Sequence, residues 1–346
     1  MKCCGAQLVR FRLRSAGRSV AARRGISLLE VLISMFVLLV GLVGVAALIP
    51  AGRKEMLEGG KSDRAAALAT GALHDLKVRG VLNPTSWYDQ TTPANNNPIQ
   101  YNSGSPYFLN LPCLIDPLGM AAMAAGTFSP PLPAPPLPAP IYRITLGPTL
   151  SAPARQAMAD AVFRAQDDLV FDLPTGDVQP AFQKFFTDAN NNIAKRLSEG
   201  NYSWMVTLVP TVTRDTYTAS VAVFYQRNFI GTGGERVVGA TVVPGSPDVT
   251  LGPPFNSPAD LNVKTGEWLM LAGPPLTPPG ANAIPAPAIY SWYQILSAPA
   301  ADPTNPNMRQ VTLAGADLPP SANVTQAWLF DGIIAVYQRT VQLQFQ

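Results

Sequence analysis

Residues that carry chemistry are scarce in this chain of 346 residues. It has one histidine, His74, and three cysteines, of which Cys3 and Cys4 lie at the amino terminus and Cys113 stands far from them. Any centre that pairs a histidine with a serine or cysteine nucleophile would have to use His74. Asp, Glu, Lys and Arg together make up 14% of the chain, about half of their usual share. These shortages disfavour an enzyme, a histidine-based zinc site and a disulfide framework.

Charge is almost missing from the stretch between Ile26 and Gly52, where Glu30 is the only charged residue. The 22 residues from Val31 to Gly52 would extend about 33 Å as a helix, which is enough to cross a bilayer. A cleaved secretory signal has a shorter apolar region, of about 7 to 15 residues, followed by a small-residue cleavage site. We therefore predict one membrane-spanning helix over residues 26–52.

Basic residues without any acid precede this helix. By the positive-inside rule they hold the amino terminus in the cytoplasm, which predicts a single-pass protein of the cytoplasmic membrane with its carboxyl-terminal part outside the cytoplasm. Without these seven residues, 18 Lys and Arg face 22 Asp and Glu, so the exported part gives no indication of nucleic-acid binding. The seven are Lys2, Arg10, Arg12, Arg14, Arg18, Arg23 and Arg24.

The acid at Glu30 needs an explanation, because a carboxylate near the end of a membrane helix is costly and usually has a partner. Cleavage of the chain after Gly25 would create an α-amino group at Ile26, four residues earlier and on the same helix face. That amine, or the same amine of a neighbouring copy, would then pair with Glu30. The alternative is that Glu30 simply lies in the membrane interface, where its cost is small.

The run Gly25-Ile26-Ser27-Leu28-Leu29-Glu30 resembles the processing site of type IV prepilins. The resemblance implies that residues 1–25 are a basic leader, that a prepilin peptidase cleaves after Gly25, and that Ile26 becomes the methylated amino terminus. It also implies that Glu30 neutralises the amine of a neighbouring subunit during filament assembly. Other pilin or pseudopilin subunits and the assembly machinery would be the partners.

The match extends to Glu30-Val31-Leu32-Ile33, Gly41-Leu42-Val43-Gly44 and Ala46-Ala47-Leu48, which look like the PilV-type minor pilins and related secretion pseudopilins. Ile26 replaces the commoner Phe, and the 25-residue leader is longer than that of major pilins. Pro50 falls slightly later than the helix-kinking proline of major pilins. These departures favour the minor type.

Residues 53–80 keep the spacing of an amphipathic helix. Leu68, Ala72 and Leu76 fall on one face at intervals of four, which predicts an apolar stripe that docks on the globular domain. We expect a break at Pro50 and Gly59-Gly60, after which the helix resumes and ends near Gly80.

Residues 81–140 are rich in proline and asparagine, with a particularly dense run from Ser129 to Pro140. Such proline density excludes helix and central strand and favours polyproline II, so we expect an extended segment. A stiff connector is favoured over a ligand for an aromatic groove.

Residues 141–250 change to a period of two. Tyr202 to Leu208 and Tyr217 to Tyr225 predict a long antiparallel hairpin, and a turn at Gly231-Thr232-Gly233-Gly234 leads into Glu235 to Val243 on the same sheet. One short amphipathic helix is expected between Pro153 and Asp168.

Residues 251–346 form a second β-rich portion, a small sandwich or barrel. Its expected strands are Trp268 to Leu271, Ile289 to Leu296, Arg309 to Leu313 and a last one from Ile333. The fold class that follows is α+β: a long amino-terminal helix, membrane-spanning in its first half, packed on an antiparallel sheet domain.

One spacing is typical of a metal loop. Asp188, Asn190, Asn192 and Glu199 occupy positions 1, 3, 5 and 12 of a calcium-loop pattern, with the carbonyl of Ala194 at position 7. Ile193 stands where the sharp turn needs glycine, and Lys195-Arg196 bring positive charge. We expect a polar turn before the strand at Tyr202, no metal and no other cofactor, with calcium as the alternative.

The sequence therefore predicts a minor pilin or pseudopilin that assembles through its amino-terminal helix. A signal-anchored protein that displays a β-rich binding domain outside the cytoplasm is the alternative. An exported hydrolase that depends on His74 is a third hypothesis, which the scarcity of catalytic side chains disfavours.

Overall fold

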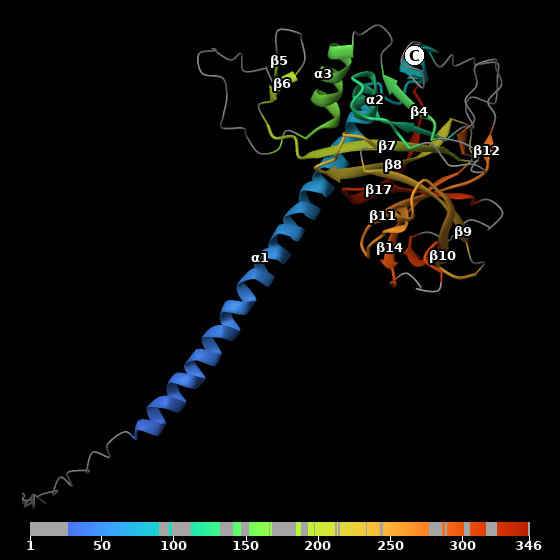
Figure 1. Ribbon diagram of the computed structural model, residues 1–346. Coiled ribbons are helices and arrows are strands. Elements are labelled where there is room, and N and C mark those ends of the chain that lie inside the picture. Colours follow the sequence, from blue (N-terminus) through green and yellow to red (C-terminus); the bar gives the residue numbers. More distant parts are fainter. Residues whose placement is uncertain are drawn as a thin grey trace, which may run out of the picture. The chain divides into compact units, whose positions relative to one another are not determined.

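The protein is an α+β molecule with one long helix and two mostly antiparallel β-sheets (Figure 1). Its chain divides into two compact units, Met1–Glu58 and Gly59–Gln346. The computed structural model describes residues 27–89, 97–98, 112–131, 141–146, 152–165, 167, 185–187, 193–196, 198–211, 213, 215–232, 234–242, 245–276, 286–287, 289–300, 305–315 and 324–344.

Helix α1 runs without interruption from Leu28 to Val78. The expected break at Pro50 and Gly59-Gly60 is therefore wrong: Pro50 lies inside the helix, and both glycines are helical. A proline removes one hydrogen bond, to the carbonyl of Ala46, but the helix formers on either side keep their own bonds, so the helix propagates through it. Single glycines weaken a helix by only about 1 kcal/mol each.

The carboxyl-terminal end of α1 follows its sequence signals. Gly80 adopts a φ of +67°, which ends the helix without a side-chain clash, and the N–H of Leu82 donates to the carbonyl of Leu76. The apolar stripe packs on the globular domain as predicted, inside the second unit to which it belongs, with Ala65, Ala69, Ala72 and Leu76 buried. Three of these four residues are alanines, which permit a close approach between the helix and the sheet.

A seven-stranded sheet forms the centre of the second unit, in the order β17-β8-β7-β3-β4-β1-β2. The predicted hairpin is confirmed, because β7 pairs antiparallel with β8 from Tyr202↔Tyr225 to Pro210↔Tyr217. Only β3 and β4 run parallel. The bounds are β1 Trp87–Asp89, β2 Asn97–Pro98, β3 Cys113–Ile115, β4 Arg143–Leu146, β7 Tyr202–Pro210, β8 Thr216–Tyr225 and β17 Ile333–Gln342.

The second sheet closes into a six-stranded barrel, in the order β10-β15-β14-β11-β16-β9. Three of its strands lie where the alternating pattern predicts them, and β10 and β16 were not predicted. Their bounds are β9 Glu235–Val242, β10 Asp248–Phe255, β11 Trp268–Ala272, β14 Tyr290–Ser297, β15 Arg309–Ala314 and β16 Gln326–Phe330. Two small pairs complete the strands: β5 Phe185–Thr187 with β6 Ile193–Arg196, and β12 Pro275–Leu276 with β13 Ala286–Pro287.

Two strands belong to a different sheet from the one predicted. β9 lies in the barrel, although the sequence predicts it as a continuation of the β7–β8 meander. β17 follows the barrel strands in sequence but pairs with β8 at the edge of the central sheet. The chain crosses from the barrel to the central sheet at Gly332, which has a φ of +83°. A Cβ atom added there would lie 2.9 Å from the carbonyl oxygen of Tyr225, so only glycine fits.

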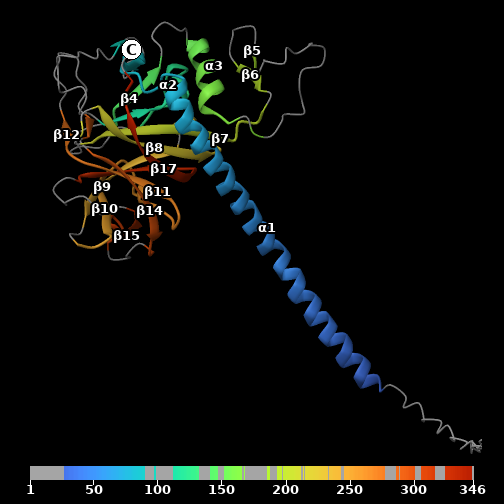
Figure 2. The same ribbon diagram turned by 180° about the vertical axis from the view of Figure 1, so that it is seen from behind.

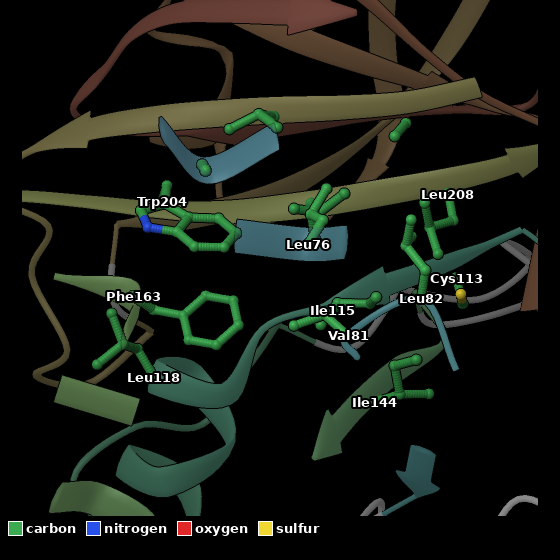
Figure 3. Packing of buried hydrophobic residues seen from close by; sticks show 14 of the residues in the cluster. Leu76, Val81, Leu82, Cys113, Ile115, Leu118, Ile144, Phe163, Trp204 and Leu208 are labelled. Atoms are coloured by element: carbon green, nitrogen blue, oxygen red, sulfur yellow. The ribbon is translucent and has the colours of Figure 1, made fainter. Parts of the chain in front are cut away.

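The central sheet is covered on both faces. Helices α2 Pro117–Ala124 and α3 Ala152–Phe163 and the end of α1 lie on one face, and the barrel lies on the other (Figures 1 and 2). Figure 3 shows the cluster under the helices, where Phe163 of α3 packs on Trp204 of β7 with ring centroids 4.3 Å apart. Alternate residues of the same strands, such as Met205 and Ala222, face the barrel.

Residues 81–140 are not extended throughout, contrary to the prediction. They supply β3, near the middle of the central sheet, and helix α2 Pro117–Ala124, besides the 3-10 turn Pro84–Ser86 and β1. Pro117 is compatible with α2 because it occupies the first turn, where its missing N–H costs nothing. The dense proline run from residue 132 to 140 lies outside the described residues.

The short helix α3 Ala152–Phe163 agrees with its prediction, and its most buried residues are Ala159 and Phe163. A 3-10 turn, Pro258–Leu261, joins β10 to β11. The predicted glycine turn before β9 is confirmed at Gly231 and Gly234, which have φ values of +66° and +72°, while Gly233 lies outside the described residues.

Candidate functional site

The first turn of α1 contains the described part of the predicted processing and assembly site. Ser27 caps the helix: its Oγ accepts a hydrogen bond from the N–H of Leu29 at 3.2 Å, and its carbonyl accepts one from the N–H of Glu30 at 2.9 Å. Gly25 and Ile26 lie outside the described residues. The helix that would follow the predicted cleavage therefore begins two residues after Ile26.

Glu30 lies in this first turn, exposed to solvent. A carboxylate here is favoured by the positive end of the helix dipole, and the spacing from Ser27 to Glu30 is that of a capping box. Among the residues that the structure describes, Glu30 has no ion-pair partner. An acid at position 30 is thus explained by the start of the helix alone. Its carboxylate is also available to a cation from outside the chain.

The surface of the helix from residue 31 to 52 is apolar all round. Large side chains such as Phe36 and Leu48 are 68% and 70% exposed. Ser34, one of its few polar residues, donates its hydroxyl to the carbonyl of Glu30 at 2.7 Å and so needs no water. An exposed surface of this kind is unfavourable in water, and helices that are apolar on every side are buried in a membrane or among other helices.

This helix satisfies the length and composition of a membrane span. Its most apolar 18-residue window has a mean hydropathy of 2.9, and none of that window is buried by the rest of the chain. Among the described residues, one helix is therefore long and apolar enough to cross a bilayer, which is consistent with a single-pass membrane protein.

Comparisons of the chain with protein-family models, with curated proteins and with solved structures give no match. The resemblance to prepilins therefore depends on the residues around Gly25 and Glu30, and the structure adds the setting of those residues that it describes.

The calcium pattern lies largely outside the described residues, which include neither Asp188, Asn190 nor Asn192. Ala194 lies in β6, and Glu199 is exposed, with its carboxylate accepting a hydrogen bond from the side-chain amide of Asn201. In the part of the chain that the structure describes, no three His, Cys, Asp or Glu side chains gather as metal ligands. Calcium binding stays a prediction.

The side chains of His74 and Cys113 belong to no catalytic arrangement in the described structure. His74 is exposed on α1 and lines a groove of about 490 Å³ with Lys77 and Arg339. The other lining residues include no carboxylate and no serine or cysteine. Cys113 is a free, buried thiol in β3, and its burial raises its pKa to about 12, which keeps it unreactive.

A cluster of four buried charges was not predicted from the sequence. Asp116, Arg143, Arg227 and Glu235 come from the start of α2, from β4, from the loop after β8 and from the start of β9, and none is more than 7% exposed. Asp116 caps α2 through the N–H of Gly119 at 3.1 Å. The pair Asp116-Pro117 is a local signal for that cap, but nothing local links residues up to 119 positions apart.

The ion pairs in this cluster are close and numerous. Arg143 Nη1 lies 2.6 Å from Asp116 Oδ2, and Arg143 Nη2 contacts a carboxylate oxygen of Glu235. Arg227 reaches both carboxylates, Asp116 at 2.7 Å and Glu235 at 3.1 Å. Two positive and two negative charges balance, so the cluster ties the central sheet to the barrel without a net buried charge.

The pKa values of Asp116 and Glu235 depend on how these two carboxylates share the guanidinium groups of Arg143 and Arg227. Burial alone would raise the pKa of Asp116, but the charges of Arg227 and Arg143, with the hydrogen bond from Gly119, outweigh it and lower this pKa to about 2. Burial raises the pKa of Glu235, and the same arginines offset this only in part, because Asp116 already carries a negative charge nearby. The cluster is a structural junction, since its oxygens are occupied and hidden from solvent.

Proposed function

We propose that this protein is a minor pilin or pseudopilin subunit of a type IV pilus or of a filament like that of type II secretion. The observation that carries the proposal is the run Gly25-Ile26-Ser27-Leu28-Leu29-Glu30 at the entrance of a helix with no further charge until Arg53. The continuity of α1 from Leu28 to Val78 supports it, because the same helix supplies the apolar segment and, in its last part, core residues of the β-rich unit.

The mechanism that follows is assembly. The apolar part of α1 holds the subunit in the bilayer and then packs with like helices, which cover the side chains that are exposed in the single chain. Cleavage after Gly25 frees the amine of Ile26, and the carboxylate of Glu30 neutralises the amine of a neighbouring subunit. An unpaired amine or carboxylate is costly inside an apolar helix bundle. A register of neighbouring helices that leaves either group unpaired is therefore disfavoured.

The partners in this proposal are the membrane, a prepilin peptidase and other filament subunits with their assembly machinery. The leader stays on the cytoplasmic side because its seven basic residues, unaccompanied by acids, resist transfer. The β-rich unit then lies outside the cytoplasm.

Mass spectrometry of the amino-terminal peptide tests the proposal. Co-expression with an active prepilin peptidase is expected to give a chain that begins at methylated Ile26, and Gly25→Val is expected to keep the leader. Cells without the peptidase provide the control. A wild-type chain that retains residues 1–25 beside the active peptidase would contradict the proposal and favour a plain signal anchor that displays the β-rich unit.

A further inference from the structure

A groove of about 670 Å³ opens where the barrel separates from the central sheet. Its floor comes from strands of the sheet and includes Thr218 and Ser220 of β8 and Gln338 of β17. One wall comes from the barrel and includes Trp268 of β11 and Gln294 of β14, which are paired directly across the two strands. The volume lies within the range of small-molecule sites, about 300–1,000 Å³.

The groove exists because the face of the sheet changes character along its strands. At one end Met205, Ala222 and Phe224 pack against the barrel, and the barrel fits closely there. Further along the same face come hydroxyl and amide side chains, with Ser220 directly opposite Gln338. The indole N–H of Trp292 donates a hydrogen bond to Thr207 Oγ1 at 2.9 Å. This bond lies between the apolar part and the polar part of the face.

The described part of the lining carries no charge. Of the fourteen described residues that line the groove, none is Asp, Glu, Lys, Arg or His. An ionic ligand would lose its hydration there without gaining a counter-charge, and a metal ion would find no carboxylate or imidazole. A purely apolar ligand would bury the hydroxyl and amide groups of the floor without partners. The ligand that fits is neutral, rich in hydrogen-bonding groups and apolar on one face.

Trp268 supplies the aromatic part of this site. It is partly exposed, whereas Tyr290, Trp292 and Tyr293 are nearly buried, so a ligand meets mainly one aromatic ring. The indole Nε1–H of Trp268 is buried and has no acceptor among the described residues, so a ligand meets the exposed part of the ring rather than this donor.

We propose that this groove binds an uncharged saccharide, with a sugar ring against Trp268 and its hydroxyls on Thr218, Gln294 and Gln338. A sugar ring combines a C–H face that packs on an aromatic ring with hydroxyls that both donate and accept. A peptide that adds as a strand finds no free backbone edge on β8 or β14, which pair on both sides, and could add only along the edge strand β17. A proline-rich peptide requires more than one accessible aromatic ring.

The test uses the full-length protein in a detergent without a sugar headgroup. Neutral hexasaccharides of glucose, N-acetylglucosamine, mannose and galactose are titrated by calorimetry and by tryptophan fluorescence, beside hexagalacturonate and a synthetic peptide of residues 129–140. At least one neutral hexasaccharide is expected to bind with a Kd of about 1 mM or below. Hexagalacturonate and the peptide are expected to bind more weakly than that sugar.

Variants locate the binding. Trp268→Ala is expected to weaken it at least about tenfold, as for a central aromatic contact. Trp268→Phe is expected to lie between, because it keeps an aromatic ring but a smaller one. Gln338→Ala is expected to weaken binding several-fold, and since Gln338 is exposed this variant keeps the fold if Trp268→Ala does not. Leu296→Ala, an exposed residue of the same strand β14 outside the groove, is the control and is expected to bind as the wild type does.

Three results would overturn the proposal: no binding of any neutral hexasaccharide, tighter binding of hexagalacturonate or the peptide than of every neutral sugar, or unchanged sugar binding in both Trp268→Ala and Gln338→Ala. Sugar binding is measured without prepilin processing, so its failure would leave the proposed filament role standing, and an unprocessed leader would leave the groove standing.

Discussion

Arg227 holds Asp116 in a two-pronged ion pair inside the protein, with Nη1 2.7 Å from Oδ1 and Nη2 2.7 Å from Oδ2. Arg227 lies in the loop that carries the chain from the central sheet to the barrel, and Asp116 joins the end of β3 to α2 and caps that helix. The same guanidinium also reaches Glu235 at the start of β9. One side chain thus fixes where the chain leaves the sheet and where it enters the barrel.

Replacement of Arg227 by Met is expected to destabilise the protein by about 3–5 kcal/mol, because it leaves buried carboxylate charge without its partner. Urea unfolding followed by tryptophan fluorescence measures this loss. Arg79→Met is the matched control, since Arg79 pairs with Asp75 on the exposed surface of α1, and its expected cost is below about 1 kcal/mol. Equal losses in the two variants would show that the buried cluster does not stabilise the junction.

Acid is expected to weaken the junction through Asp116. Its pKa is about 2 in the folded chain against an ordinary 3.8, so the stability that it contributes is present above about pH 4 and is lost as the pH falls towards 2. The amount is about 2 kcal/mol. The raised pKa of Glu235 acts in the opposite sense, because its share is present below the ordinary glutamate pKa and is lost as the pH rises through the raised value.

Urea unfolding at pH 4, 3 and 2 checks this dependence. Asp116→Asn is expected to be less stable than the wild type at every pH but to lose less between pH 4 and pH 2. Asp331→Asn, at an exposed partner of Arg236, is the control and is expected to keep the slope of the wild type. The same acid slope in Asp116→Asn and wild type would assign the acid lability to other groups.

The docking of α1 on the sheet is expected to depend on small side chains. Ala69 is fully buried against the sheet, so Ala69→Leu overpacks the contact and is expected to cost about 1–3 kcal/mol. Ala67→Leu, at an exposed position of the same helix, is expected to change stability by less than about 0.5 kcal/mol. Thermal unfolding compares the two, and an equally stable Ala69→Leu protein would mean that the helix does not need this close approach.

The role of Glu30 is tested by Glu30→Ala. Under the proposed function, membrane insertion and leader cleavage survive, while incorporation into filaments falls, because the neighbouring amine loses its carboxylate. Sheared filament fractions probed with an antibody to the β-rich unit measure incorporation. Glu58→Ala removes an acid from the exposed surface of the same helix and is expected to assemble normally. Wild-type incorporation of Glu30→Ala would remove the charge-pairing role.

The sequence was sufficient for several elements that depend on neighbours in the chain. The period of 3.6 between Leu68 and Leu76 places the docked stripe, and the period of two from Tyr202 to Tyr225 gives the hairpin with its register. The apolar run after Glu30 predicts a helix long and apolar enough to cross a bilayer. The run at Gly25 and Glu30 also yields the functional hypothesis, from residues next to one another.

Only the tertiary structure decided which strands share a sheet. β9 and β17 are apolar on both faces or of mixed pattern, so periodicity identifies them as strands but does not choose between the sheet and the barrel. The same limit hid the buried cluster and the groove, because Asp116 and Glu235, or Trp268 and Gln338, meet through packing across large sequence separations. Local patterns report the free energy of local conformations, whereas a charge pair or a groove between two sheets exists only after the chain has closed both of them.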